Sequence, residues 1–293
     1  MQMKHQAWML ALAVLVIGCE EAPEQGGNGS GVESPRSFPP VADLSAEGPY
    51  GKARLDRTGP DGNYTVFRPG TLAPNGLRNP IVSWGNGGLT TPLDYPLLEH
   101  LASHGFVVIA SNNILVNANQ VRAGIDWILA QNNASSSPFY QKLDVDHVAG
   151  VGYSNGGLAT YGAADHPALD TLVIISGANV NATARTTNMP KLHTPVAYLC
   201  TADAASRGNC AADYAVVDEP AFFGVMNGSG HTDVTTLLGL AKDPIIERLN
   251  VATLAWLRFQ LMDDASQRSM FLGASCGLCR DPNWTVEPPK GWN

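Results

Sequence analysis

Short apolar runs rich in β-branched residues alternate along this chain with longer segments whose apolar residues recur at helical spacing. The run FVVIAS at 106–111 is apolar up to its last residue, which is typical of a strand covered on both sides. Strands that alternate with helices predict an α/β fold, with a mostly parallel central sheet and helices on both faces. The expected strands are 63–69, 79–85, 106–111, 146–153, 171–177, 195–201 and 220–226, and the expected helices are 93–105, 121–133, 156–165 and 244–262.

The first 18 residues have the features of a lipoprotein signal peptide. Lys4 precedes the apolar run AWMLALAVLVIG, which is too short for a permanent transmembrane helix but fits a signal-peptide core. The run ends in Val-Ile-Gly-Cys, which resembles a bacterial lipobox, where cleavage leaves Cys19 lipidated. We therefore expect an exported lipoprotein anchored to the outer membrane or cell surface. The alternative is a plain secretory signal with an incidental cysteine.

Two further parts follow the predicted signal peptide. Residues 19–48 comprise the lipidated cysteine and a tether that is rich in Gly, Ser, Glu and Pro, a composition that cannot bury enough apolar surface to fold. Residues 49–293 show no internal boundary, and their length suits one domain with a C-terminal tail. The net charge of −8 argues against nucleic acid as a partner.

Four cysteines remain after Cys19, and an oxidising compartment favours disulfides between them. Three pairings are possible, of which the local pairs Cys200–Cys210 and Cys276–Cys279 need the fewest assumptions. A redox or zinc motif is the alternative for the Cys-x-x-Cys sequence, although no second pair or histidine stands at zinc spacing. With the local pairs, one disulfide lies in the tail and the other closes the segment TADAASRGN between Cys200 and Cys210, which is expected to be a polar loop.

The stretch VGYSNGG at 151–157 places a serine between glycines, at the point where a predicted strand meets a predicted helix. In the pattern Gly152-x-Ser154-x-Gly156, the small residues let strand and helix approach, and the strained turn lifts the serine hydroxyl above the sheet. The helix that follows points its first amide groups at the same place. Ser154 is therefore the candidate nucleophile, with an ordinary strand-to-helix turn as the alternative.

A serine nucleophile needs a base, and His231 stands in the loop NGSGH after the last predicted strand. His100 and His104 are expected to be partly exposed helix residues. Asp203 follows the strand before His231, so it completes the chain order Ser-Asp-His, although it could instead be a helix cap. Asp213 and Asp218 are rival acids further along the chain, and Asp170 stands at the wrong edge of the sheet.

Acyl transfer also needs two amide donors for a developing oxyanion. Asn155, directly after the serine, supplies the first candidate amide. The second is expected from the Gly-rich loop SWGNGGLT, where Asn86 is preferred and Gly87 comes next. The expected chemistry uses no cofactor and no metal.

These motifs together resemble the α/β-hydrolases of the bacterial cutinase and polyester (PET) hydrolase type, which are related to dienelactone hydrolases and chlorophyllases. The resemblance runs over most of residues 48–262. It includes GPYGKARLDRTGPDGNYTVFRPG, LASHGFVVIAS, Asp126-Trp127, LDVDHVAGVGYSNGG, LCTAD and GSGHTD. It implies the α/β-hydrolase fold, with Ser154 as nucleophile, Asp203 as acid, His231 as base and amides near Asn86 and Asn155 as the oxyanion hole.

The chain departs from this family around the serine. Tyr153 and Asn155 stand where the family usually has His or Trp and Met, and Asn86-Gly87-Gly88 replaces a loop that usually offers an aromatic side chain. The segment SGANVNA at 176–182 has no tryptophan, which the family often has there. We therefore expect a cleft that is more polar and less aromatic than that of a polyester hydrolase.

The expected function is hydrolysis of small or polymeric carboxylic esters by a monomeric serine esterase through an acyl-enzyme, with the membrane as a second partner through the lipid. A peptidase or amidase would use the same triad, and hydrolysis of short p-nitrophenyl esters against peptide anilides would separate the two. A lipid-tethered binding protein with this fold and no catalysis is the third alternative.

Replacing Cys19 by Ser tests the anchor. The variant cannot carry the lipid, so we expect it to appear in the soluble fraction as an active enzyme, whereas the wild type fractionates with membranes. Fractionation followed by an esterase assay measures this. A Cys19→Ser protein that stays fully membrane-bound would mean that another anchor exists.

Overall fold

The computed structural model describes residues 38–237 and 243–292. The predicted signal peptide, the predicted lipidation site Cys19 and most of the predicted tether lie outside the described residues. The strands are β1 (Ala53–Thr58), β2 (Tyr64–Arg68), β3 (Asn79–Gly85), β4 (Val107–Ser111), β5 (Leu143–Tyr153), β6 (Thr171–Ile175), β7 (Val196–Thr201), β8 (Ala221–Met226) and β9 (Trp284–Lys290). The helices are α1 (Pro96–Ser103), α2 (Ala118–Gln131), α3 (Asn155–Gly162), α4 (Ala182–Asn188), α5 (Ala204–Val216), α6 (Asp243–Leu261), α7 (Arg268–Phe271) and α8 (Gly277–Arg280).

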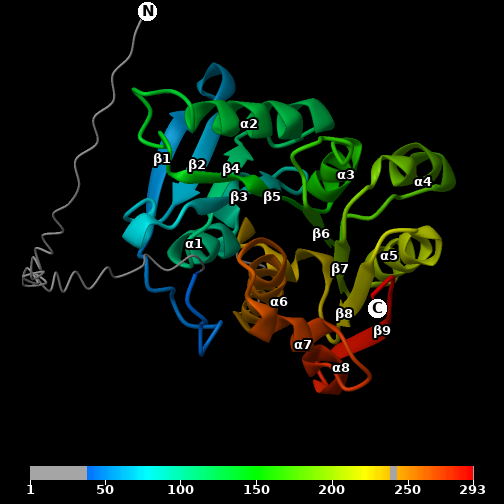
Figure 1. The fold of residues 1–293 in the computed structure, drawn as a ribbon. Coiled ribbons are helices and arrows are strands. Elements are labelled where there is room, and N and C mark those ends of the chain that lie inside the picture. The colour runs from blue at the N-terminus through cyan, green and yellow to red at the C-terminus, as the bar shows by residue number, and fades with distance from the viewer. Residues whose placement is uncertain (1–37, 238–242, 293) are drawn as a thin grey trace, which may run out of the picture. The chain divides into compact units, whose positions relative to one another are not determined.

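The described strands form one sheet in the order β1-β2-β4-β3-β5-β6-β7-β8-β9 (Figure 1). The pairs from β4 through β3, β5, β6 and β7 to β8 are parallel, while β1, β2 and β9 join antiparallel at the two edges. The mostly parallel sheet predicted from the alternating pattern is therefore confirmed. Because the carboxyl ends of the parallel strands lie on one edge, the loops after β5, β7 and β8 can meet there.

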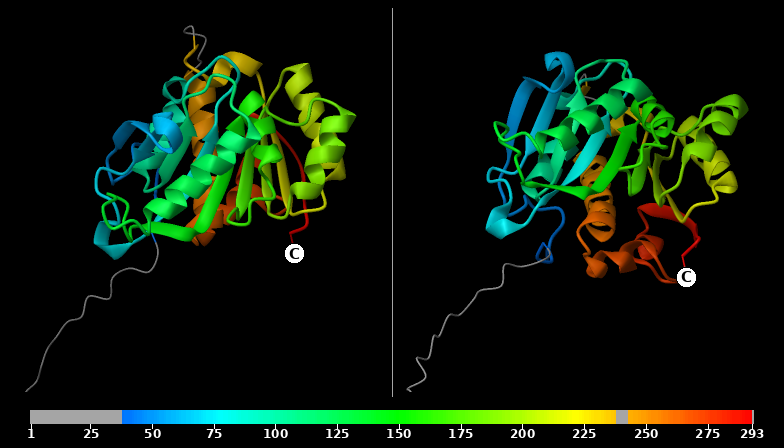
Figure 2. Two further views of the ribbon diagram at one scale, coloured as in Figure 1. Left: turned by 90° about the horizontal axis from the view of Figure 1, so that it is seen from above. Right: turned by 45° about the horizontal axis from the view of Figure 1, so that its top comes forward.

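Helices cover both faces of the sheet, as the continuously apolar strands require. Helices α2, α3 and α5 lie on one face and α1, α6 and α7 on the other (Figures 1 and 2). Every residue of β3, β4, β6, β7 and β8 is buried. The sheet divides the core into two apolar clusters, one under each layer of helices. None of the helices in the described residues is long and apolar enough to cross a lipid bilayer.

The last part of the predicted tether is folded. Phe38 and Leu44 are buried in the cluster beneath α1 and α6, so this part of the segment predicted as tether, which was expected to run to residue 48, belongs to the folded domain. A histidine of α1 and the histidine that caps its C-terminus hold this segment, because the Nε2 of His100 bonds the carbonyl of Leu44 and that of His104 bonds the carbonyl of Ala46. His104 is only 1% exposed, which corrects the expectation of a partly exposed residue, whereas His100 is half-buried.

Two segments expected to be irregular are regular. The stretch after Asp203 forms helix α5 instead of a polar loop. The C-terminal tail contributes β9, whose Val286 and Thr285 stand opposite Gly224 and Val225 of β8. The sheet therefore ends on a strand that comes from the last residues of the described chain.

The buried histidine predicts acid-sensitive stability. Burial lowers the pKa of His104 from 6.5 to about 4, with the nearby His100 and Arg258 adding to the effect. Between about pH 6.5 and pH 4, His104 is protonated in the unfolded chain but stays neutral in the folded protein. The free energy of unfolding should therefore fall over this range as the pH is lowered, by up to about 3 kcal/mol. Below that range this contribution stays constant.

Urea unfolding at pH 7 and pH 4.5 measures this loss. A His104→Gln variant removes the titrating group, so its stability should change less between the two pH values than that of the wild type. His193→Gln, at an exposed position, is the matched control and should behave as the wild type. Equal losses in all three proteins would contradict the assignment to His104.

Candidate active site

Ser154 stands on a sharp turn between β5 and α3. Its backbone has φ 53° and ψ −120°, a conformation that L-residues rarely adopt, and its side chain makes no bond to the helix that it precedes. Burial of the preceding strand and packing of the following helix hold this strained turn in place. The hydroxyl is therefore directed away from the helix and is free for another partner, as the elbow pattern predicts.

The two glycines of the pattern are required by close backbone contacts. A Cβ at Gly156 would lie 2.0 Å from the carbonyl oxygen of Gly85, and a Cβ at Gly152 would lie 2.4 Å from the carbonyl oxygen of Gly156. Both distances are far below any van der Waals contact, so no side chain fits at either position. The first turn of α3 thereby packs directly on the end of β3.

His231 contacts the serine. Its Nε2 lies 2.9 Å from Ser154 Oγ, and the residue begins a short 3-10 helix in the loop that follows β8. The Tyr153 hydroxyl donates a hydrogen bond of 2.6 Å to the carbonyl of His231, and the two rings lie 5.2 Å apart. The Asp233 carboxylate also accepts the amide proton of Gly230. The loop is thus fixed on both sides of the histidine, and Tyr153 is a contributor that the sequence analysis did not identify.

Asp203 lies beside these two residues but does not bond the histidine. It follows β7 and caps α5, accepting hydrogen bonds from the Thr201 hydroxyl at 2.6 Å and from the Ser206 amide at 3.0 Å. Burial acts to raise the pKa of this carboxyl, but the hydrogen bonds from Thr201 and Ser206 and the charge of His231 bring it below its usual value of 3.8. The group is therefore a carboxylate at neutral pH.

The second nitrogen of the imidazole contacts a different residue. Nδ1 of His231 lies 2.9 Å from the hydroxyl of Ser206, on the first turn of α5. The sequence analysis did not select Ser206, because a serine three residues after a helix cap carries no signal of its own. The alternative that Asp203 caps a helix is confirmed. Asp203 and His231 do not bond each other, but Ser206 bonds both of them.

The rival carboxylates belong elsewhere. Asp213 is fully buried on α5, where it accepts hydrogen bonds from the amide and side chain of Asn179 and pairs with Arg185. Burial raises its pKa, although these partners oppose the effect. Asp170, directly before β6, accepts the amide proton of Val148 in the middle of β5. Neither group bonds His231, and both have partners away from Ser154.

The two candidate oxyanion residues lie against each other at the start of α3. Asn155 is the first residue of that helix, and a Cβ at Gly156 would come within 2.5 Å of the carbonyl oxygen of Asn86. The Asn86 side chain is buried and donates to the carbonyl of Ser111 at 2.6 Å, which fixes its loop. The amide of Gly87, the other candidate, already donates to the Tyr95 hydroxyl at 2.9 Å. Gly87 is therefore engaged within the protein.

A cleft of about 530 Å³ opens beside the serine. The described residues that line it include no Phe, Tyr or Trp, which agrees with the expectation of a less aromatic site. They are Ser154, Asn155, Leu158, Ser176, Gly177, Ala178, Val180, Asp203, Ala205, Ser206, Asn209 and His231. Two of these, Leu158 and Val180, have apolar side chains larger than a methyl group, and the rest are small or polar.

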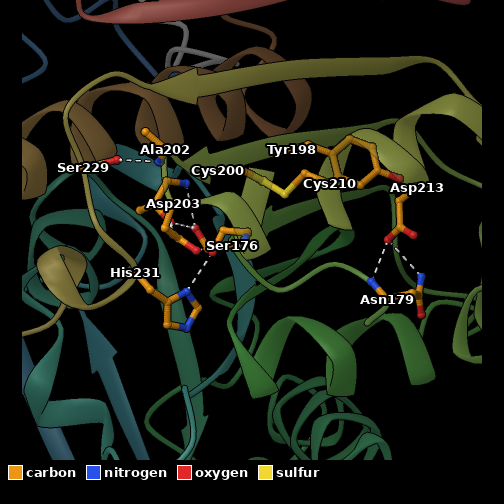
Figure 3. The surroundings of a disulfide bond; sticks show 12 residues. Ser176, Asn179, Tyr198, Cys200, Ala202, Asp203, Cys210, Asp213, Ser229 and His231 are labelled. Atoms are coloured by element: carbon orange, nitrogen blue, oxygen red, sulfur yellow. Dashed lines mark hydrogen bonds between the residues drawn. A yellow bond between two sulfur atoms is a disulfide. The ribbon is translucent and has the colours of Figure 1, made fainter. Parts of the chain in front are cut away.

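A disulfide joins the strand before Asp203 to the helix after it. Cys200 of β7 pairs with Cys210 of α5, and Cys276 pairs with Cys279 in the tail, so both local pairings are confirmed. Figure 3 shows Asp203 and His231 on one side of the first disulfide and the Asp213–Asn179 contact on the other. Residues 38–237 and 243–292 contain no cluster of three or more His, Cys, Asp or Glu placed to hold a metal ion.

Comparison with known proteins gives the family. A family model described as PET hydrolase-like matches residues 81–280, which is more than half of the chain. The chain belongs to this family of α/β-hydrolases and, at the level of the family, is an ester hydrolase. No curated protein matched the chain.

The disulfide beside Asp203 should matter more than the one in the tail. It closes a short chain segment and ties the first turns of α5 to β7, and the chain-entropy model gives about 2–3 kcal/mol for a loop of this length. We expect a Cys200→Ala/Cys210→Ala variant to have a lower melting temperature and lower ester turnover, because the Asp203 and Ser206 side chains lose their support.

The matched control is Cys276→Ala/Cys279→Ala, which removes the tail disulfide. Its turnover should stay near that of the wild type, since neither cysteine lines the cleft. Thermal unfolding and steady-state hydrolysis of a short p-nitrophenyl ester measure both properties. Equal losses of turnover in the two variants would show that the disulfide beside Asp203 has no special role.

Proposed function

We propose that the protein is a serine esterase that cleaves carboxylic esters through an acyl-enzyme, with Ser154 as nucleophile, His231 as general base and Asp203 as the acid of the triad. The observation that carries the proposal is the 2.9 Å contact between Ser154 Oγ and His231 Nε2, on a turn whose backbone is strained. Serine is a weak nucleophile unless a base within hydrogen-bond reach takes its proton. Membership of the PET hydrolase-like family supports an ester as the substrate.

The proposed reaction has two halves. Ser154 Oγ attacks the ester carbonyl carbon while His231 Nε2 takes the hydroxyl proton, and the carbonyl becomes a tetrahedral oxyanion. The imidazolium then gives the proton to the leaving alkoxide, which departs as the alcohol and leaves the acyl group on Ser154. A water molecule repeats the sequence with His231 as base, and the acid is released.

The oxyanion is assigned to the backbone amides of Asn155 and Asn86. The amide of Asn155 is at the N-terminus of α3, where unpaired amides and the helix dipole favour negative charge. Asn86 can lie against the same turn because Gly156 has no side chain. Donors that are fixed before the reaction stabilise the oxyanion without reorganising.

The acyl group is proposed to be aliphatic. Val180 lines the cleft and is 61% exposed, and Leu115 and Asn155 both lie close to Gly88. Leu89, Ile114 and Leu115 are also largely exposed, and the amide of Leu89 bonds the carbonyl of Ile114. Exposed aliphatic side chains in and near the cleft of a nucleophile favour an apolar substrate chain.

Replacing Ser154 by Ala tests the proposal directly. The variant lacks the nucleophile, so turnover of p-nitrophenyl butyrate should fall by about 10³-fold or more, while the melting temperature stays near that of the wild type. A fluorophosphonate should label the wild type at Ser154 and leave the variant unlabelled. Mass spectrometry of the labelled peptide identifies the site.

Two results would reject the assignment. A Ser154→Ala protein with nearly normal esterase turnover would remove Ser154 as nucleophile. Faster turnover of a peptide anilide than of the p-nitrophenyl ester would favour a peptidase, which uses the same groups on an amide. The control variant is Ser137→Ala, which removes a serine hydroxyl from the loop before β5, at a distance from the cleft lining, and should leave both rates unchanged.

A further inference from the structure

We propose that Ser206 is a positioning residue for the reaction, standing between Asp203 and His231 and holding the imidazole in the tautomer that can act as base. The inference rests on the proposed function. Its basis is the contact of 2.9 Å between the Ser206 hydroxyl and His231 Nδ1, in the place where a triad would have the carboxylate. The Ser206 amide bonds Asp203 Oδ1 at 3.0 Å, so one residue contacts both partners.

The direction of each hydrogen bond follows from the role of the base. His231 must accept the Ser154 proton at Nε2, so in the neutral ring the proton is on Nδ1. Nδ1–H therefore donates to Ser206 Oγ, which accepts with a lone pair. The Ser206 hydroxyl still has its own proton to donate, and the Ser206 side chain is among the groups that lower the pKa of the neighbouring Asp203 carboxyl. Ser154 thus donates to His231 and His231 donates to Ser206, while the Asp203 carboxylate accepts from the Ser206 amide.

Ser206 is well placed to impose a fixed orientation. It is 4% exposed, and the first turn of α5 on which it stands is fixed by the Asp203 cap and by the disulfide from Cys200 to Cys210. Asp203 itself is fixed by Thr201, whose hydroxyl also bonds Ser176. A side chain held in this way can set the ring orientation within the narrow tolerance that proton transfer needs.

The Ser206 hydroxyl changes how strongly the Asp203 carboxylate stabilises the protonated imidazole of His231. A carboxylate in direct contact with an imidazolium stabilises it strongly, whereas a neutral hydroxyl passes on only part of that effect through the polarised O–H bond. Ser206 should therefore fix the tautomer in the ground state and transmit the Asp203 charge when His231 becomes protonated. Loss of the hydroxyl should leave the protonated ring without its partner at Nδ1.

The central variant is Ser206→Ala in the full-length protein. Alanine keeps the amide that Asp203 caps, so the helix start is preserved while the hydroxyl is lost. We expect kcat for p-nitrophenyl butyrate to fall by about 10²-fold with KM little changed, because only the orientation of the base is affected. The rise of kcat/KM with pH should move to lower pH, because the protonated ring has lost an acceptor.

Ser206→Thr is the conservative variant and retains a hydroxyl at the same place. It should recover most of the lost kcat and the wild-type pH profile. Melting temperatures of both variants show whether the helix is intact. Proton NMR adds an independent signature, because the Nδ1 proton of His231 should be protected from exchange in the wild type and in Ser206→Thr but not in Ser206→Ala.

A double variant tests whether Ser206 and Asp203 act in one series. Asparagine is also a good helix cap, so Asp203→Asn keeps the start of α5. If the carboxylate acts through Ser206, Ser206→Ala/Asp203→Asn should lose about as much kcat as the more damaging single variant. Losses that multiply would mean that the two residues act separately, and the proposed series would be rejected.

The remaining outcomes also decide the matter. A Ser206→Ala protein with kcat and a pH profile like those of the wild type would overturn the inference, because Asp203 would then suffice alone. Equal losses in Ser206→Ala and Ser206→Thr with lowered melting temperatures would assign Ser206 a purely packing role. A wild type that neither hydrolyses the ester nor reacts with a fluorophosphonate would reject the proposed function instead.

Discussion

The active site depends on how closely three pieces of backbone approach where β5 turns into α3. A single methyl group at Gly156 would lie 2.0 Å from the backbone of Gly85, so the helix start and the end of β3 could not both keep their places. This contact holds Ser154 in its strained conformation and places Asn155 beside Asn86. The strain is tolerated because the strands on both sides are completely buried and cannot relax.

The first turn of α5 combines stability with the proposed chemistry. Asp203 caps the helix through the Ser206 amide, while the hydroxyl of the same Ser206 contacts His231. The helix is held at a second point by the disulfide, and further along by buried Asp213, which bonds Asn179 in the loop that follows β6. The wall of the cleft and the residues next to the histidine are therefore parts of one rigid unit.

The sequence predicted the parts of the fold that local patterns determine. Strand 79–85 has the predicted bounds, and the order of Ser154 and His231 along the chain led correctly to their contact. Helix α5 was missed because Gly208 and Asn209 weaken its helical pattern, so that its cap, its disulfide and its packing decide the structure. Strand β9 was missed because two prolines interrupt it, which only an edge strand tolerates. Ser206 could not be identified because its role depends on a distance across the fold.

The antiparallel pairing of β9 with β8 has a consequence for biosynthesis. The loop that carries His231 directly follows β8. Strand β9, which pairs with β8, is synthesised only after all the proposed catalytic residues. Until then β8 is an open edge, with unpaired amides and carbonyls that could pair with another chain. A nascent polypeptide that already contains Ser154, Asp203 and His231 is thus still exposed to misassembly. The pairing that protects that edge can form only after the last part of the described chain has been made.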